Sequence, residues 1–476
     1  MVIQTRLLSP LLREEGRCGW LAPTVMDAAW KDCSALACAP MATTTATCGT
    51  DPELGHQRAD SREDHVPTLL HHRSVTADAD AKVGNEEKGP MTSLEAYFSL
   101  INMILNYGIF SMPLVFLRSG MLAALLLPLV GCVCTYTAVL LGRVLEQMKA
   151  KGISRPNYGT TARAIAGPTF EALMHAACSA ELVIYALGNL ILLSRSLESL
   201  MPYLDHCHVI AACSVFAVIL SAMPDVVFAY ASLLSACSIS IACATVVASG
   251  FDLPEWAGEV QVAGALEKLP VSLALITFNA AVHPVLPWIF NNTASREDYE
   301  RAMWNGWLTW AMCGTFLGGT VYYMFGDAVQ VVATQNIGRD LEMRHLPAAQ
   351  GLVGFSAAWV VLKLQVSLVP ITRPLTEALA EALGIKLPCG NGGVRCVLLS
   401  CPVFLALALA TQALEHHLAI LESLAGGVLM SLNAFIFPSL AYLLACRPRS
   451  LFAQAGASTA VAFGVALILL VTSGFL

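Results

Sequence analysis

Eleven apolar stretches, each near the length of a membrane-spanning helix, occupy most of the chain after residue 93. They lie at 94–117, 121–145, 171–200, 207–223, 228–250, 270–291, 301–325, 348–371, 395–413, 418–445 and 455–475. A helix of about 20 apolar residues crosses a bilayer, where the backbone must satisfy its own hydrogen bonds. The chain of 476 residues is 56% hydrophobic and only 13% charged, whereas a soluble protein carries about 25% charged residues. The sequence therefore predicts an all-α, multi-pass membrane protein with about eleven transmembrane helices.

The first 92 residues differ in composition from the rest. Residues 1–92 are polar and rich in Ala, Thr, Asp, Glu and His. They contain no basic segment followed by an apolar one, the pattern of a secretory signal peptide. We therefore predict a disordered cytosolic tail over 1–92 and a transmembrane domain over 93–476.

Lys and Arg residues are divided unevenly between the loops on the two sides of the predicted membrane. One set of loops carries Lys149, Lys151, Arg155, Arg163, Arg296, Arg301, Arg373, Lys386, Arg447 and Arg449. The other set carries only Arg118, Lys268, Arg339 and Arg344. Because cytosolic loops are enriched in Lys and Arg, the first set is predicted to face the cytosol, and the N-terminus with it.

The first span holds polar and helix-breaking residues at its centre. These are Asn102, Asn106, Tyr107, Gly108 and Pro113. A broken helix in lipid leaves N–H and C=O groups unpaired unless protein, water or a ligand satisfies them. The interruption therefore predicts a binding site; a kinked helix in which Gly108 merely allows close packing is the alternative.

The sixth span is interrupted in the same way. It carries Asn279, His283, Pro284 and Pro287 within an otherwise apolar segment. If eleven spans divide as five, five and one, spans 1 and 6 occupy equivalent places in two inverted repeats. A pair of interrupted helices in matching positions is typical of the central site of a secondary transporter.

Two isolated ionisable residues lie deep in spans that this division also makes equivalent. Glu181 is in span 3 and Lys363 is in span 8. A charge at the centre of a membrane helix costs at least about 2.5–3.5 kcal/mol, so both side chains are expected to face the bundle interior. They can form a charge pair, or one of them can exchange protons; a static ion pair or a lysine reaching toward the membrane surface is the alternative.

Several classes of function are not indicated. No motif for a hydrolase, a zinc site or a cofactor is present, and most of the 16 cysteines lie inside apolar runs, where Cys acts as a small hydrophobic residue. No cluster of Lys and Arg with interleaved aromatic residues points to nucleic acid. We therefore expect no enzyme activity, metal or cofactor.

Span 1 and the segment after it resemble the amino acid/auxin permease family, and within it the vacuolar and vesicular amino acid transporters. In LINMILNYGIFSMPLVFLRSG, the residues Asn102, Gly108, Ile109 and Pro113 match the family's segment. The stretches GCVCTYTAVLLGRVLE and RPNYGTTARAIAG are similar to the family's next span and loop. One departure is Asn106, which stands in place of the family's first Gly.

The resemblance continues through the later spans and covers roughly residues 93–475. Its positions include Glu181 in span 3, His283 and Pro287 in span 6, and Lys363 and Ser367 in KLQVSLVPITRPLTEAL. The family's Gly before the span 6 His is Val here. Because both glycine replacements restrict the backbone where it is expected to unwind, substrate preference can differ from that of other members.

The resemblance implies a LeuT-type fold with a 5+5 inverted repeat and discontinuous helices 1 and 6. It also implies secondary transport of amino acids by alternating access, in which spans 1, 2, 6 and 7 rock against the others. Exposed N–H groups of the interruption suit the carboxylate of an amino acid, and free carbonyls with an Asn side chain suit its ammonium. The candidate substrate-binding residues are Asn102, Asn106, Tyr107, Gly108, Ile109, Phe110, Phe278 and Asn279.

The resemblance further implies coupling to a proton gradient in a vacuolar, vesicular or other endomembrane, with the plasma membrane as an alternative. The candidates for proton coupling or gating are His283, which suits titration near neutral pH, Glu181 and Lys363. Ser367 lies where sodium-dependent relatives use a hydroxyl ligand, so sodium coupling is an alternative, as is a sensor on the same fold that binds amino acids without transporting them. The expected partners are an amino acid, protons or sodium, and the lipid bilayer, with the protein as a monomer.

Overall fold

The structure is a computed structural model that describes residues 89, 91–223, 225–346, 349–385 and 393–475. Residues 86–476 form one compact unit. The predicted tail lies almost wholly outside the described residues, so its predicted disorder and location stay predictions.

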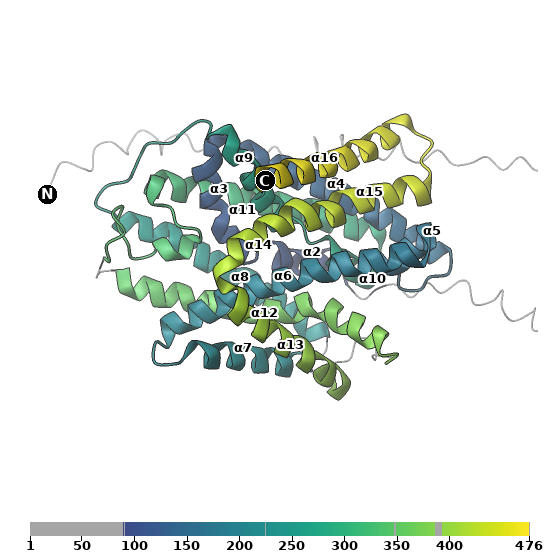
Figure 1. Cartoon of the computed structure of the whole chain (residues 1–476), viewed down its shortest axis with the longest axis horizontal. Helices are drawn as coiled ribbons and strands as arrows, with labels where there is room; N and C mark the ends of the chain where they lie inside the picture. Colours follow the sequence, from purple (N-terminus) through teal and green to yellow (C-terminus); the bar gives the residue numbers. More distant parts are fainter. Residues whose placement is uncertain (1–88, 90, 224, 347–348, 386–392, 476) are drawn as a thin grey trace, which may run out of the picture. The chain divides into compact units, whose positions relative to one another are not determined.

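The described chain is helical, and its helices follow the eleven predicted spans in order (Figure 1). The first repeat contains α2 (Ser93–Ile104), η1 (Tyr107–Ser111), α3 (Met112–Ser119), α4 (Ala123–Ala150), α6 (Pro168–Leu200), α7 (His206–Leu220) and α8 (Asp225–Ser249), with the short helix α5 (Tyr158–Ala166) between α4 and α6. The second repeat contains α9 (Leu269–Ala280), η5 (His283–Val285), α10 (Leu286–Asn292), α11 (Arg296–Phe325), α12 (Gln350–Ala382) and α13 (Val394–Leu414), followed by a tenth span of α14 (Leu418–Leu424), η10 (Ala425–Leu429), η11 (Ser431–Ile436), α15 (Phe437–Ala441) and η12 (Tyr442–Cys446). The last span is α16 (Leu451–Phe475).

Within the described residues, eight helical stretches are long and apolar enough to cross a membrane by length and composition. One of them, Tyr107–Ala150, joins the second half of span 1 to span 2. Span 7, formed by α11, begins with several charged residues, and α7 is a shorter apolar helix. Together with the interrupted first span, these complete the eleven spans that the sequence predicts.

The first interruption lies where the sequence predicts it. The helix α2 begins at a capping box between Thr92 and Glu95 and ends at Ile104. The chain then becomes extended at Asn106, with φ −106° and ψ −167°. Pro113 lies in the first turn of α3, where its missing N–H leaves no helical hydrogen bond unmade.

The second interruption separates α9 from α10 by the same local chemistry. The helix α9 ends at Ala280, and Ala281 is extended. Pro284 lies in the short turn η5, and Pro287 lies in the first turn of α10. Because proline cannot donate a backbone hydrogen bond, a continuous helix through this segment would leave carbonyl groups unpaired.

Packing between helices follows the predicted inverted repeat. The first half of span 1, α2, packs on α8, the fifth span of its repeat, and α9 packs on η10, in the tenth span. In addition, α2 packs on α11 of the other repeat, as α9 packs on α4. The structure thus confirms the predicted fold class of two five-helix repeats with discontinuous first and sixth helices.

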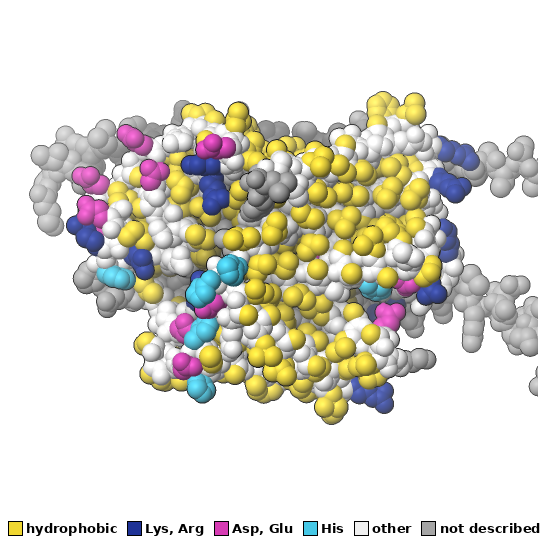
Figure 2. All heavy atoms as spheres, viewed as in Figure 1, with side chains coloured by type: hydrophobic (Ala, Val, Ile, Leu, Met, Phe, Trp, Pro, Cys, Tyr) yellow, Lys and Arg dark blue, Asp and Glu magenta, His cyan; other side chains and the backbone are white. Residues whose placement is uncertain are grey.

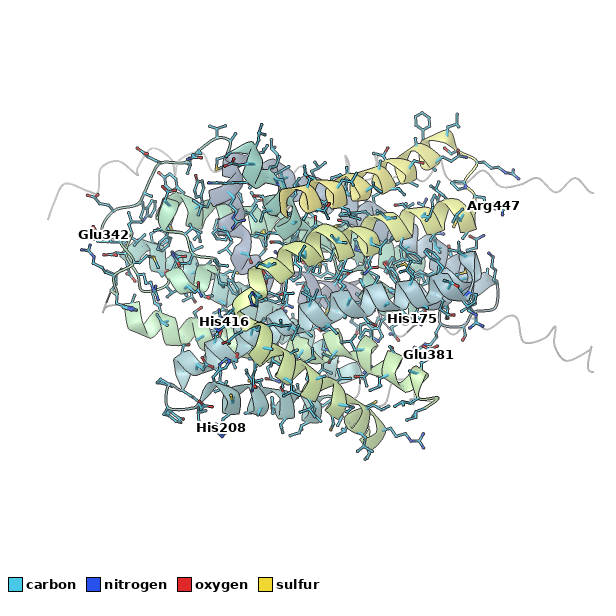
Figure 3. All side chains as sticks on the ribbon, viewed as in Figure 1. His175, His208, Glu342, Glu381, His416 and Arg447 are labelled. Atoms are coloured by element: carbon cyan, nitrogen blue, oxygen red, sulfur yellow. The ribbon has the colours of Figure 1, made fainter. Side chains whose placement is uncertain are left out.

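The two ends of the bundle differ in charge. Figure 2 shows a broad hydrophobic band between them, and Figure 3 shows Arg447 at one end and Glu342 at the other. We call the first the basic end; its loops carry Lys149, Lys151, Arg155, Arg163 and Arg447. We call the second the acidic end; its loops carry Asp252, Glu255, Asp340 and Glu342. Exposed apolar side chains such as Leu125, Phe316 and Leu469 cover the band, as expected for a surface that faces lipid.

Candidate functional site

The two interruptions touch each other at Gly108 and Asn279. A Cβ atom at Gly108 would lie 1.5 Å from Asn279 Oδ1, so only glycine allows this approach. The Asn279 amide also donates to the carbonyl of Leu275, at 2.8 Å, which fixes the side chain against η1. The backbone groups freed by both broken helices are therefore gathered at one place in the interior.

Three aromatic rings form a wall beside this contact. Tyr107 of η1, Tyr185 of α6 and Phe278 of α9 have ring centroids 5.6–6.0 Å apart, and all three are buried. The Tyr185 hydroxyl donates to the carbonyl of Met103 at 2.7 Å, near the end of α2. The sequence predicted Tyr107 and Phe278 but missed Tyr185, which lies one helical turn after Glu181 on the same face of α6.

Several buried polar atoms around the first interruption lack hydrogen-bond partners among the described residues. They include both amide atoms of Asn106, the hydroxyl of Tyr107 and both amide atoms of Asn189. Asn189 lies two turns after Glu181 on the face of α6 that carries Tyr185. Such atoms are costly to leave unpaired in an apolar interior, so this face is suited to a polar ligand.

For two of the predicted substrate-binding residues, the structure shows packing or burial rather than a contact with the second interruption. Ile109 lies against α11, where a Cβ atom at Gly314 would be 3.5 Å from its Cδ1. Phe110 is fully buried.

Lys363 lies at the contact between α12 and the end of α2. Its Nζ donates to the backbone carbonyl of Asn102 at 2.6 Å, to Asn102 Oδ1 at 2.8 Å and to Ser367 Oγ at 3.0 Å. Ser235 of α8 and Ser367 also donate to Asn102 Oδ1. The Asn102 side chain is thus engaged with Lys363 and its neighbours rather than turned toward the contact between the interruptions.

Glu181 and Lys363 have separate partners, so the predicted alternative of a direct charge pair is wrong. Glu181 accepts a hydrogen bond from Asn433 Nδ2 of η11 at 2.7 Å. The carbonyl of Asn433 accepts a hydrogen bond from Tyr158 at 2.8 Å. The sequence did not identify Asn433, because a single Asn in an apolar span gives no indication of which span it contacts.

His283 is fully buried at the second interruption. Its Nε2 lies 3.0 Å from Thr137 Oγ1 and 3.2 Å from the carbonyl of Cys134, both in α4. Thr137 already donates to backbone carbonyls of α4, so the ring Nε2–H is the donor in both contacts. Nδ1 has no partner among the described residues, and the ring packs against Trp307. In this arrangement His283 ties the second interruption to α4 as a neutral imidazole.

Glu422 of α14 is a buried acidic residue that the sequence analysis missed. Its side chain is 5% exposed and interacts with the Tyr107 hydroxyl, although the two do not form a hydrogen bond of ordinary geometry. One turn later, Gly426 packs directly on α9, where a Cβ atom would lie 2.1 Å from the carbonyl of Ala274. The sequence does contain an indication of its importance, because Glu422 is an isolated acidic residue in the apolar span at 418–445, as Glu181 is in span 3.

Comparisons with known proteins identify the family of this chain. A family model described as "Transmembrane amino acid transporter protein" matches residues 89–476. The chain belongs to this family. Members are amino acid transporters rather than enzymes.

Related sequences and structures show the extent of the similarity. The chain is 26% identical over 370 residues to amino acid transporter AVT1D of Arabidopsis thaliana, and the match covers 72% of this chain and 62% of that protein. It is 23% identical over 392 residues to AVT1E of the same plant, covering 79% and 70%. It therefore spans about three fifths of the length of AVT1D. A manganese transporter of Eremococcus coleocola has the same fold, with a TM-score of 0.53, 14% identity, and coverage of 80% of this chain and 85% of that one.

The interior of this transporter-family protein is covered differently at the acidic end and at the basic end. At the acidic end, the turn η7 (Ala333–Asn336) packs on η1, α3, α8 and α12. The Asn336 side chain holds this loop closed by accepting from the N–H of Gln330 at 3.0 Å and donating to the carbonyl of Ala328 at 2.9 Å. Toward the basic end, a small hollow lies between Trp288 of α10 and Arg373 of α12. The first interruption is thus covered on its acidic side.

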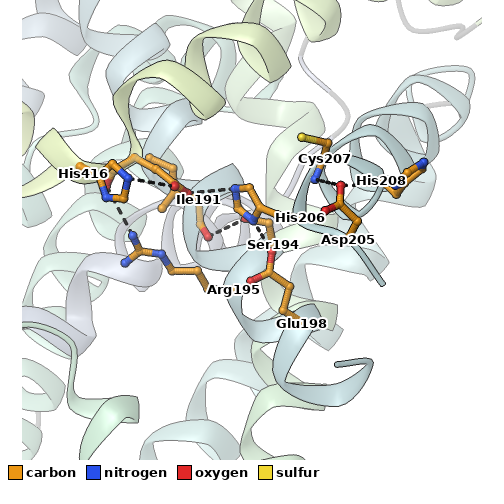
Figure 4. Close-up of polar contacts among 10 residues, drawn as sticks. Ile191, Ser194, Arg195, Glu198, Asp205, His206, Cys207, His208 and His416 are labelled. Carbon is orange, nitrogen blue, oxygen red and sulfur yellow. Dashed lines mark hydrogen bonds and ion pairs between the residues drawn. The ribbon is translucent and has the colours of Figure 1, made fainter. Parts of the chain in front are cut away.

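A polar cluster joins three spans at the acidic end (Figure 4). His206, which begins α7, contacts Glu198 near the end of α6 through Nδ1 and Glu415 of η9 (Glu415–His417) through Nε2, the latter at 2.9 Å. Arg195 also donates to the carbonyl of Glu415 at 3.5 Å. The cluster links α6, α7 and η9 through polar side-chain contacts.

Proposed function

We propose that this protein is a secondary transporter that moves amino acids across a membrane by alternating access, driven by protons. The observation that supports it most is the hydrogen bonding of Lys363 to the end of α2. This contact joins a charge on one helix to the first interruption, where the family resemblance places the substrate. Movement of α2 therefore changes the surroundings of a buried charge.

An amino acid suits the place where the two interruptions meet. The extended segment at Asn106 and the start of η1 present backbone N–H groups, which suit a carboxylate. The carbonyl groups at the ends of α2 and α9 suit an ammonium group. A zwitterion satisfies both kinds of unpaired backbone group at once.

Coupling needs an ionisable group whose surroundings differ between the two states of the transporter. His283 contacts α4, and both belong to the spans that the resemblance places in the rocking bundle. Glu181 contacts Asn433, and both belong to the spans that form the scaffold. Lys363 alone of the three predicted candidates bonds across the boundary, from scaffold helix α12 to bundle helix α2. We therefore assign proton coupling to Lys363.

The same contact favours protons over sodium. The Lys363 ammonium lies within 3.0 Å of three oxygen acceptors, including Ser367 Oγ, the residue proposed from the sequence as a cation ligand. A sodium ion at Ser367 would have to displace this tethered cation. Lys363 thus supplies the positive charge that a bound ion would otherwise provide.

Orientation follows from charge, and the compartment follows from the family resemblance. Because cytosolic loops are rich in Lys and Arg, we place the basic end in the cytosol and the acidic end in the lumen of an acidic endomembrane compartment. The match to AVT1 transporters supports an amino acid as the solute.

The test is amino acid uptake into proteoliposomes that contain the full-length protein. With a pH gradient in sodium-free potassium buffer, we expect accumulation above equilibrium, and we expect a protonophore to abolish it. Accumulation that survives the protonophore but requires sodium would replace protons by sodium as the driving ion. Specific binding of amino acids without counterflow would show a sensor instead of a transporter.

A further inference from the structure

The buried carboxylate of Glu422 is not used by the proposed transport mechanism. It lies in the first turns of span 10, where the resemblance assigns no role, and its side chain is 5% exposed. The charge interactions found for it among the described residues are with Tyr107 and Tyr185, neither of which is a cation. A buried carboxylate without a cationic partner is costly, so its presence beside the candidate site needs a reason.

Tyr107 shows where Glu422 lies relative to the first interruption. Tyr107 begins η1, and a Cβ atom at Gly188 would lie 2.0 Å from the Tyr107 hydroxyl, so the ring extends from the interruption to α6. Glu422 interacts with that hydroxyl at the far end of the ring. The carboxylate is therefore about one long side chain away from the backbone that is suited to the carboxylate and ammonium of an amino acid.

The side chains between these two points suit an aliphatic stem with a cationic tip. The rings of Tyr107, Tyr185 and Phe278 pack against one another there, and aromatic faces attract cations as well as apolar groups. Asn189 lies one turn beyond Tyr185 on the same face of α6, and neither of its amide atoms has a hydrogen-bond partner among the described residues. Its amide oxygen is an acceptor for a second N–H of the same cation.

We propose that Glu422 is the counter-charge for the side chain of a cationic amino acid, so that the substrate class includes lysine, ornithine and arginine. This inference rests on the proposed transport function and adds its substrate class. The substrate's α-carboxylate and α-ammonium bind at the interruptions, its stem lies along the three rings, and its terminal cation pairs with Glu422. The Asp and Glu residues of the acidic-end loops favour the approach of cations from that side.

The experiment compares amino acids that share a shape and differ in charge. Binding of arginine and citrulline, and of lysine and norleucine, is measured by calorimetry on the purified full-length protein, and each pair is tested in proteoliposome counterflow. We expect the cationic member of each pair to bind roughly 10- to 100-fold more tightly, since the extra contact is a hydrogen-bonded charge pair. In Glu422→Gln this preference falls to about threefold or less, whereas Glu422→Asp keeps most of it.

Glu267→Gln is the matched control, because Glu267 is exposed in a loop at the acidic end. It is expected to keep the wild-type preference. Equal binding of the neutral and cationic members by the wild-type protein would overturn the inference without any variant, and counterflow of neutral amino acids would then leave the proposed function standing. A preference that persists in Glu422→Gln, or a loss of pH-driven uptake in that variant without a change in preference, would also overturn it. Absence of counterflow for every amino acid would remove the proposed function, and this inference with it.

Discussion

Replacing Lys363 by methionine separates binding from energy coupling. Methionine keeps the length and apolar stem of lysine but cannot donate to the carbonyl and Oδ1 of Asn102, which accept at 2.6 and 2.8 Å. The buried charge disappears along with the bonds that stabilise it, so the net change in folding stability is expected to be small. Ser235 and Ser367 still donate to Asn102 Oδ1, which keeps the end of α2 in place.

The structure sets the size of the effect. Hydrogen bonds to a charged group contribute about 1.5–3 kcal/mol each, so the two bonds from Lys363 to α2 are worth about 3–6 kcal/mol to the protonated state. One pH unit corresponds to about 1.4 kcal/mol per proton. The contact is therefore strong enough to transmit a gradient of about two to four pH units, and its loss in Lys363→Met removes all of this coupling.

The assay measures the accumulation ratio and counterflow in the same proteoliposomes. With a gradient of one pH unit, one proton per amino acid allows about tenfold accumulation in the wild-type protein. We expect Lys363→Met to equilibrate the amino acid without accumulating it, while exchange in counterflow stays within about threefold of wild type. Lys268→Met, which removes an exposed lysine, is the control and keeps full accumulation. Accumulation by Lys363→Met equal to that of wild type would refute the assignment of Lys363.

Three further substitutions test other contacts. Gly108→Ala places a methyl group where Asn279 lies, so we expect overpacking of about 1–3 kcal/mol and weaker amino acid binding by calorimetry; unchanged affinity would contradict the contact between the interruptions. His206→Gln removes the contacts of the imidazole ring with the carboxylates of Glu198 and Glu415, worth up to about 1 kcal/mol each, so Tm should be lower than that of the wild-type protein, and an unchanged Tm would contradict it. Desolvation raises the pKa of Asp340, but hydrogen bonds and charge from Arg344 outweigh it and hold that pKa below its usual value. The ionised Asp340 carboxyl therefore stabilises its loop at every pH above the usual carboxyl pKa, and this stabilisation is lost only as the pH falls through the lowered pKa. Asp340→Asn should speed hydrogen exchange of the loop at pH 7 but not at pH 2.

The fold could be predicted because the bilayer restricts what a chain can do. Apolar stretches of spanning length permit only helices there, and the two interrupted spans were visible from Gly108, Pro113, Pro284 and Pro287 without any contact information. Both interruptions lie at the predicted residues. Helix ends followed from local chemistry, as with the capping box of Thr92 that begins α2.

The partners of the buried polar residues could not be predicted from the same pattern. Internal symmetry makes the places of Glu181 and Lys363 equivalent, which suggested that they meet. Equivalent positions are related by the symmetry axis and need not touch; Lys363 bonds to span 1, and Glu181 bonds to span 10. Which side chain faces another depends on helix rotation and tilt, and tertiary packing sets both.

Residues on the spans without interruptions were also missed. Tyr185 and Asn189 lie one and two helical turns after Glu181, so the helical period alone places them on its face. Glu422 was overlooked although it is an isolated acid in an apolar span, which by itself indicates a functional position.

The most direct test of proton-driven transport follows protons while the amino acid moves. Proteoliposomes in sodium-free buffer, with no imposed gradient and a pH-sensitive dye inside, receive an inward gradient of amino acid. The account predicts that the internal pH changes as the wild-type protein takes up the amino acid, and that Lys363→Met takes it up with no change of internal pH. Uptake by the wild-type protein without any proton movement would contradict it.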